Sequence, residues 1–285
     1  MKFFCKCIRG IFTSPLTYIA AVLFAVLCAA GVTVDINRDT YSFFEIIANK
    51  KLFDTARASS QCASYLIAIR FTQSSWYPIG LAVLTAIPAL YTYIRSLEKI
   101  DRFCLIRLNF KTYSAGVILS SFLSGLMIVI VGLIIYFGAS YLLFPSLASF
   151  NDPVYEIIYG DTSQKLFSML KLMLNHAFVG GVIPVFAITL YRFIHSDFLA
   201  ATIPMMLMYV SIKLIPNYRE WFSSDIQRLE NPFAKLMIFL FPSAMTGLGD
   251  TLEYSFNAPF WLAYIFFGSL VFAMYLLFYR SIRRV

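Results

Sequence analysis

Charged residues are scarce in this chain of 285 residues: 13% are Asp, Glu, Lys or Arg, and 60% are apolar. Soluble domains carry nearer a quarter of charged residues, because their surface faces water. The composition therefore excludes an ordinary soluble domain. The few charges are also distributed unevenly, since six long stretches contain no Lys, Arg, Asp or Glu.

Histidine and cysteine are scarce as well, with two His and five Cys residues. A hydrolase or a zinc enzyme needs His, Cys or carboxylate side chains at ligand or triad spacing, and no such cluster is visible. We therefore expect no catalytic site, no metal and no cofactor in this chain. We interpret His176 as a packed, hydrogen-bonded side chain, and the pair Cys5 and Cys7 as interfacial residues instead of metal ligands.

A phosphate-binding loop is missing too. The pattern GxxxxGK[ST] does not occur, and Gly247 and Gly249 have neither the lysine nor the preceding strand that such a loop needs. No carboxylate lies near the middle of an apolar stretch, where carriers coupled to a proton or sodium gradient usually have one. If the chain takes part in transport, we expect the energy to come from a separate subunit.

The apolar stretches predict an all-α, polytopic membrane protein with a single transmembrane domain over residues 1–285. A bilayer core about 30 Å thick requires roughly 20 residues of helix, and the backbone inside lipid must form its own hydrogen bonds. The fifth span is the shortest, and we expect Lys213 at its end to reach the headgroups. The six predicted spans are 15–34, 74–94, 113–140, 172–191, 197–215 and 257–279.

The distribution of basic residues predicts the orientation. If both termini are inside, the four inner segments contain twelve Lys or Arg and three acidic residues, whereas the longer outer segments contain eleven basic and twelve acidic residues. Inner loops of membrane proteins are enriched in Lys and Arg. We therefore predict that both ends are cytoplasmic and that the net charge of +8 faces anionic lipid or a cytoplasmic partner, since no nucleic-acid-binding motif accompanies it.

Three segments outside the spans have patterns of their own. Residues 1–14 have basic side chains on one helical side and apolar ones on the other, which predicts an amphipathic helix in the inner membrane interface. Residues 43–52 predict a short surface helix. The apolar run within 233–250 is too short to cross a bilayer, so we predict a re-entrant segment or outer surface helices.

Small residues follow one side of the third span at spacings of four and seven residues. Ser121, Gly125 and Gly132 would let another helix approach closely. We therefore predict a helix-packing surface at these three positions.

The inner segment 95–111 is the strongest candidate for an interaction site. If it is helical, Arg95 and Lys99 can pair with Glu98 and Asp101 at spacings of three or four residues, and an apolar side remains free. A solvated loop on the membrane surface is the alternative. If this segment does not bind a partner, the next candidates are the N-terminal helix and the turn 192–197. The residues that we select are Arg95, Glu98, Asp101, Arg102, Phe103, Arg107 and Lys111.

The order Arg107, Lys111, Tyr113, then Ser120-Ser121 and Ser124-Gly125 resembles a motif of ABC-2 type transporter permeases. The layout of six spans with an interfacial N-terminal helix is similar to the small peptide-exporter and immunity permeases of Gram-positive bacteria. The sequence departs from that pattern at Arg95, near the place where the family often has an acidic residue.

The resemblance implies a subunit that crosses the bacterial cell membrane and exports an amphipathic or hydrophobic substrate such as a peptide. Its partners would be a cytoplasmic ABC ATPase subunit, which holds ATP and Mg²⁺, a second permease copy or paralogue, and membrane lipid. Segment 95–111 would be the coupling segment, with Phe103 as its apolar anchor. The alternatives are a self-contained secondary transporter or channel, a membrane-embedded enzyme that modifies lipids, and a membrane scaffold or sensor.

Overall fold

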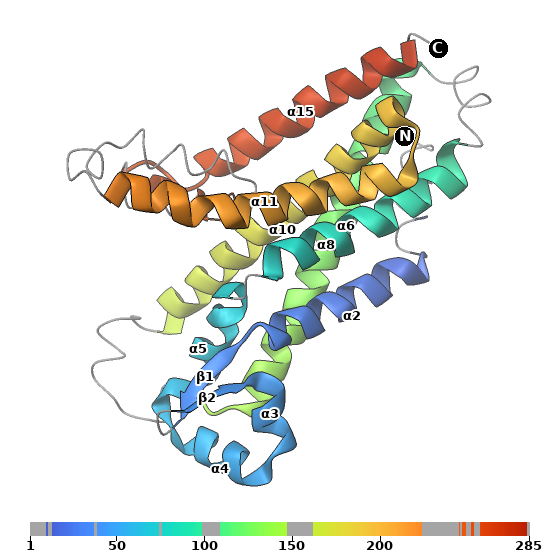
Figure 1. Cartoon of the computed structure of the whole chain (residues 1–285). Coiled ribbons are helices and arrows are strands. Elements are labelled where there is room, and N and C mark those ends of the chain that lie inside the picture. The colour runs from blue at the N-terminus through green and yellow to red at the C-terminus, as the bar shows by residue number, and fades with distance from the viewer. Residues whose placement is uncertain are drawn as a thin grey trace.

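Long apolar helices dominate the computed structural model (Figure 1), which describes residues 10, 13–36, 39–73, 76–98, 109–146, 162–223, 245, 247–248, 252–253 and 257–283. In these ranges, five helices are long and apolar enough to cross a membrane. The predicted helical membrane protein is thereby confirmed in outline. The five helices are α6 (Tyr77–Thr92), continued by the π-helical turn η3 (Tyr93–Glu98), α8 (Phe110–Leu143), α10 (Thr162–Ile194), α11 (Asp197–Ser223) and α15 (Leu262–Arg283).

The first apolar stretch forms a shorter helix, α2 (Pro15–Ala30), which has 16 residues. At 1.5 Å per residue this helix is about 24 Å long, below the usual length of a span. Pro15 occupies the first turn, where its missing N–H costs nothing. The predicted span 15–34 extends too far, because the β-branched residues after Gly31 enter a strand. A sixth membrane crossing therefore stays a prediction.

A small unit of short elements over residues 33–73 follows α2 at one end of the bundle, and we call it the outer unit for this position (Figure 1). It includes a hairpin that the all-α prediction missed. Strands β1 (Thr33–Ile36) and β2 (Asp39–Ser42) pair antiparallel, with Thr33 opposite Ser42. Ser42 then caps α3 (Phe43–Ala48) through reciprocal hydrogen bonds with Glu45. The single helix predicted for 43–52 is wrong, because Asn49 leaves the helical conformation and caps a new helix, α4 (Lys50–Ala58).

The outer unit is anchored to α8. Its last elements are η1 (Ser60–Cys62), α5 (Ser64–Ile69) and η2 (Arg70–Gln73). The hydroxyl of Tyr136 on α8 donates a 2.6 Å hydrogen bond to the Ile67 carbonyl, and the Ser64 N–H donates a 2.9 Å bond to the Pro145 carbonyl. These bonds fix the outer unit to the end of α8.

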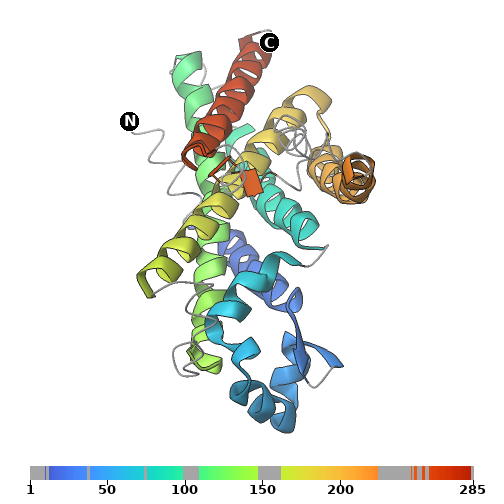
Figure 2. The same ribbon diagram turned by 90° about the vertical axis from the view of Figure 1, so that its left-hand side faces the viewer.

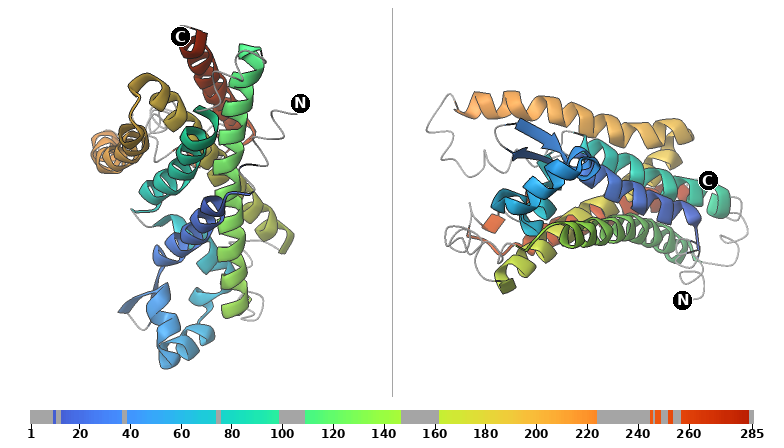
Figure 3. Two further views of the ribbon diagram at one scale, coloured as in Figure 1. Left: turned by 90° about the vertical axis from the view of Figure 1, so that its right-hand side faces the viewer. Right: turned by 90° about the horizontal axis from the view of Figure 1, so that it is seen from below.

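Helix α8 is the central element of the bundle, and it packs against α2, α6, α10 and α15. Figures 2 and 3 show it running through the length of the molecule between these helices. Asn109 accepts a hydrogen bond from the Lys111 N–H and caps its first turn, so the helix starts three residues before the predicted span. Helix α10 likewise begins ten residues before the predicted 172, and α11 continues past the predicted 215 to Ser223. Lys213 thus lies within α11 instead of at its end.

Successive helices run in alternating directions (Figure 1). The starts of α2, α8 and α11 lie on the side of the bundle away from the hairpin, together with the ends of η3, α10 and α15. This is the side to which the basic segments of the sequence connect. Three predicted segments fall largely outside the described residues: the interfacial helix 1–14, the stretch 99–108 of the coupling segment, and the outer segment 233–250.

Candidate functional site

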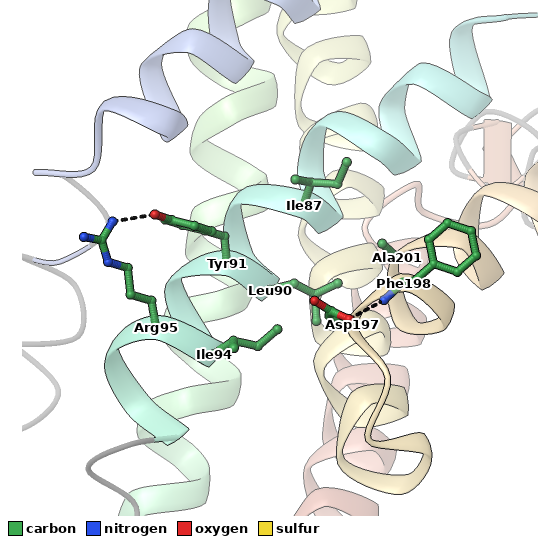
Figure 4. Close-up of a pocket in the computed structure, with 8 residues that line it drawn as sticks. All are labelled: Ile87, Leu90, Tyr91, Ile94, Arg95, Asp197, Phe198 and Ala201. Carbon is green, nitrogen blue, oxygen red and sulfur yellow. Dashed lines mark hydrogen bonds between the residues drawn. The ribbon is translucent and has the colours of Figure 1, made fainter.

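A pocket of about 600 Å³ lies between α6, η3 and α11, on the side where the basic segments connect (Figure 4). Most of its wall is apolar. Asp197 lies at the start of α11, and the Arg95 side chain extends from η3 toward Tyr91, on the side away from α11. The lining residues are Ile87, Leu90 and Tyr91 of α6, Ile94 and Arg95 of η3, and Asp197, Phe198 and Ala201 of α11.

Arg95 is held against α6 by an aromatic residue one turn earlier. Its guanidinium donates a hydrogen bond to the Tyr91 hydroxyl and lies 5.6 Å from the centre of the Tyr91 ring. Such cation–π contacts are worth about 0.5–1 kcal/mol at exposed sites. The ion pairs of Arg95 and Lys99 with Glu98 and Asp101 stay a prediction, because Lys99, Asp101 and the side chain of Glu98 lie outside the described part.

The turn between α10 and α11 places the opposite flank. His195 adopts a left-handed backbone conformation with φ of 55°, and its N–H donates a 2.8 Å bond to the Tyr191 carbonyl, which ends α10. Asp197 then begins α11 and accepts a 2.9 Å bond from the Phe198 N–H. A carboxylate is favourable at the first turn of a helix, since it faces the positive end of the helix dipole. The same turn leaves Phe198 71% exposed.

The pocket brings together the coupling segment 95–111 and the turn 192–197, which the sequence presents as two separate candidates. Asp197 and Phe198 are about one hundred residues from Arg95 in the chain, so no local pattern predicts that they line the same pocket. The one local feature of this site is an aromatic residue in the first turn of α11. Of the selected residues, Asp101, Arg102, Phe103 and Arg107 lie outside the described ranges, and Lys111 is exposed in the first turn of α8.

The small-residue surface of α8 packs against two helices instead of one. A Cβ atom on Gly125 would lie 2.0 Å from the Gly180 carbonyl oxygen of α10, and one on Gly132 would lie 2.8 Å from the Ala21 carbonyl oxygen of α2. Both distances are too short for any side chain, so the absence of one permits the contact. Ser121 is buried, and its hydroxyl donates to the Val117 carbonyl on its own helix.

His176 lies in the core of the bundle. Because α10 begins at Thr162, His176 is near the middle of the helix, whereas the predicted span 172–191 places it about one turn from the end. Its Nδ1 is 2.7 Å from the Tyr77 hydroxyl of α6, and its ring packs 5.0 Å from that of Phe71. The residue is packed and hydrogen-bonded, which agrees with its interpretation from the sequence.

No group of three or more His, Cys, Asp or Glu side chains is arranged to hold a metal ion within the described ranges. The pocket at Arg95 and Asp197 is suited to a different task. An apolar wall with charges of opposite sign at its flanks fits an apolar side chain of a partner protein, whose neighbouring charges would set the orientation. No known protein family, curated protein or solved structure matches this chain.

Proposed function

We propose that this chain is the membrane-spanning subunit of an ABC-type exporter and that the pocket at Arg95 and Asp197 is where the cytoplasmic ATPase docks. The observation that carries the proposal is the junction of segment 95–111 with the turn 192–197 at one apolar, charge-flanked pocket. The apolar helices support a place in the membrane. The basic segments that connect to this side of the bundle support its cytoplasmic orientation.

The pocket is large enough to receive bulky side chains. Phe198 and Leu199 are exposed next to it, at 71% and 45%. Exposed aromatic residues at the centre of an interface are the ones that contribute most to binding. In this proposal Phe198 supplies a second anchor beside Phe103, and Arg95 and Asp197 fix the register of the partner.

The fold offers a route by which ATPase closure would act on the membrane helices. The pocket is walled by η3 on one side and α11 on the other, so a docked partner moves both. Helix α6 packs against α8, α10 and α11. It continues directly into η3, which is itself a π-helical turn, and such irregular turns within helices often occur at functional sites. Displacement of η3 would therefore shift α6 relative to the helices around it.

The complete exporter in this proposal contains two permeases, identical or paired, and two ATPase subunits in a bacterial cell membrane. The substrate is amphipathic or hydrophobic, such as a peptide. The test is reconstitution of the purified chain in liposomes with and without its ATPase. Export of such a substrate only when both the ATPase and ATP are present is expected, whereas robust transport by the chain alone would contradict the proposal.

A carrier driven by a proton gradient is the second candidate, and the pair of Tyr77 and His176 favours it. This pair places two titratable side chains in the core between α6 and α10, and such residues within membrane helices often form proton pathways. Transport driven by a pH gradient without ATP, and abolished by His176→Phe, would establish the carrier instead of the ABC exporter.

A further inference from the structure

A second, smaller pocket lies where α10 is flanked by α11 and α15. Its volume is about 240 Å³, and every lining residue is apolar: Val179, Val182, Ile183, Phe186, Pro204, Leu207, Met208, Met245, Leu270 and Met274. Helix α10 packs against both α11 and α15. Figure 2 shows α11 and α15 standing apart on either side of α10.

The volume is sufficient for a hydrocarbon group. An apolar cavity of about 150 Å³ in a soluble protein stays dry and binds benzene, so a cavity of this size and lining accepts a longer alkyl segment. Three of the lining side chains are methionines, whose flexible thioethers adapt to ligands of different shape. The pocket is therefore suited to an alkyl chain and has no polar group to bind a head group.

The polar group lies one helical turn away. Asn175 is four residues before Val179, so it occupies the same face of α10 as the pocket lining. Its side chain is 1% exposed, and neither its amide nitrogen nor its amide oxygen has a hydrogen-bond partner. An unpaired buried amide destabilises the fold, and a ligand that supplies both a donor and an acceptor would recover this energy.

A compensated ion pair lies one further turn along α10. Lys171 pairs with Glu253, and the ammonium lies 5.3 Å from the centre of the Phe260 ring. Because Lys171 is already neutralised, this end of the site does not require a charged ligand. The order along α10 is thus an ion pair, then an unpaired amide, then an apolar pocket.

We infer that α10, α11 and α15 form a binding site for an amphiphile with one alkyl chain and an uncharged head that carries an amide or hydroxyl group. The alkyl chain occupies the pocket, and the head forms hydrogen bonds with both ends of the Asn175 amide. The site lies within one chain and does not depend on the ATPase or on the direction of transport.

The test uses the full chain in lipid nanodiscs and a photoreactive dodecanamide with a diazirine in its alkyl chain. Crosslinks are expected at lining residues such as Met208 and Met274, and unlabelled dodecanamide should compete better than dodecane. Asn175→Leu should weaken dodecanamide binding about tenfold, as for the loss of one or two hydrogen bonds, and leave dodecane competition unchanged. In the absence of ligand the same variant should melt at a higher temperature than the wild type, because it removes the unpaired amide.

A matched pair of variants separates the pocket from nonspecific partition into lipid. Leu207 lines the pocket and is 41% exposed, whereas Leu276 of α15 is 40% exposed and does not line it. Leu207→Trp should abolish the crosslinks at Met274, and Leu276→Trp should not alter them. Equal crosslinking in both variants would overturn the site.

Competition also identifies the source of the amphiphile. A monoacylglycerol and an N-dodecanoyl dipeptide amide, whose C-terminus is uncharged, both carry the required head and chain. Displacement by only the first would indicate a membrane lipid, and displacement by only the second would indicate an exported peptide. Displacement by dodecane alone would show that Asn175 takes no part, and this result would contradict the inferred ligand class.

Discussion

The contact between Gly125 and Gly180 predicts a large penalty for a single methyl group. In Gly125→Ala the new Cβ would lie 2.0 Å from the Gly180 carbonyl oxygen and 2.7 Å from Cγ of Pro184. A normal van der Waals contact is about 3.5–4.0 Å, so the methyl group cannot be accommodated by rotation of a side chain. The backbones of α8 and α10 must separate by more than 1 Å, in an interior that is close-packed.

The expected change in the free energy of unfolding is the balance of two opposing contributions. Overpacking of a core costs typically about 1–3 kcal/mol, and replacing glycine by alanine inside a helix gains up to about 1 kcal/mol. Gly138 on the same helix provides the control, because a Cβ there would meet nothing within 4 Å. Gly138→Ala retains the propensity gain and lacks the clash. The two variants should therefore differ in stability by about 1–3 kcal/mol, with Gly125→Ala the less stable.

The assay is thermal unfolding of both purified variants in one detergent, followed by size-exclusion chromatography after heating. Gly180→Ala adds a graded comparison, since its Cβ would meet the movable Val129 side chain at 2.4 Å, and we expect a smaller loss. Equal melting temperatures for Gly125→Ala and Gly138→Ala would refute the close approach of α8 to α10.

Three further predictions concern the outer unit. Tyr136→Phe removes the hydrogen bond to the Ile67 carbonyl and should cost about 1–3 kcal/mol, since a buried acceptor loses its donor; unchanged thermal stability would contradict this. Cys62 is fully buried, and its burial raises the pKa of the thiol. An impermeant maleimide added to intact cells at pH 7 should therefore label Cys62 only after denaturation. Rapid labelling of the native protein would disprove its burial. Hydrogen bonds from the Ser42 N–H and hydroxyl lower the pKa of Glu45. This cap therefore stabilises the fold above the usual Glu pKa of about 4.3, and its contribution is lost as pH falls through the lowered value. The stabilities of the wild type and of Glu45→Gln should differ at pH 7 and converge at the lowest pH, and a constant difference would contradict the cap.

The long helices could be predicted because each depends on a local property, an uninterrupted apolar run. Their ends could not, since caps such as Asn109 and the extension of α10 to Thr162 lie in polar sequence beyond the apolar run. The hairpin of β1 and β2 was missed because each strand has only four residues, too few for a reliable alternation pattern.

The candidate site, too, could be predicted from the sequence only in part. Arg95 was identified from charge and segment length alone. Its position across a pocket from Asp197 and Phe198 depends on packing of α6 against α11, and no local pattern encodes a contact between segments so far apart in the chain. The two partners of the α8 glycines were equally inaccessible, because spacing shows that a surface is flat but not which helix covers it.

Site-specific photocrosslinking in native membranes tests the proposed docking site most directly. A photoreactive amino acid is placed at Phe198, which is 71% exposed at the pocket, or at Leu142, which is 86% exposed at the opposite end of α8. We expect the probe at position 198 to capture a protein with a GxxxxGK[ST] phosphate loop and the probe at position 142 not to capture it. Arg95→Ala should weaken the capture. Capture of that ATPase from Leu142 instead, or ATP-dependent export that continues with no ATPase captured at Phe198, would contradict the proposed docking site.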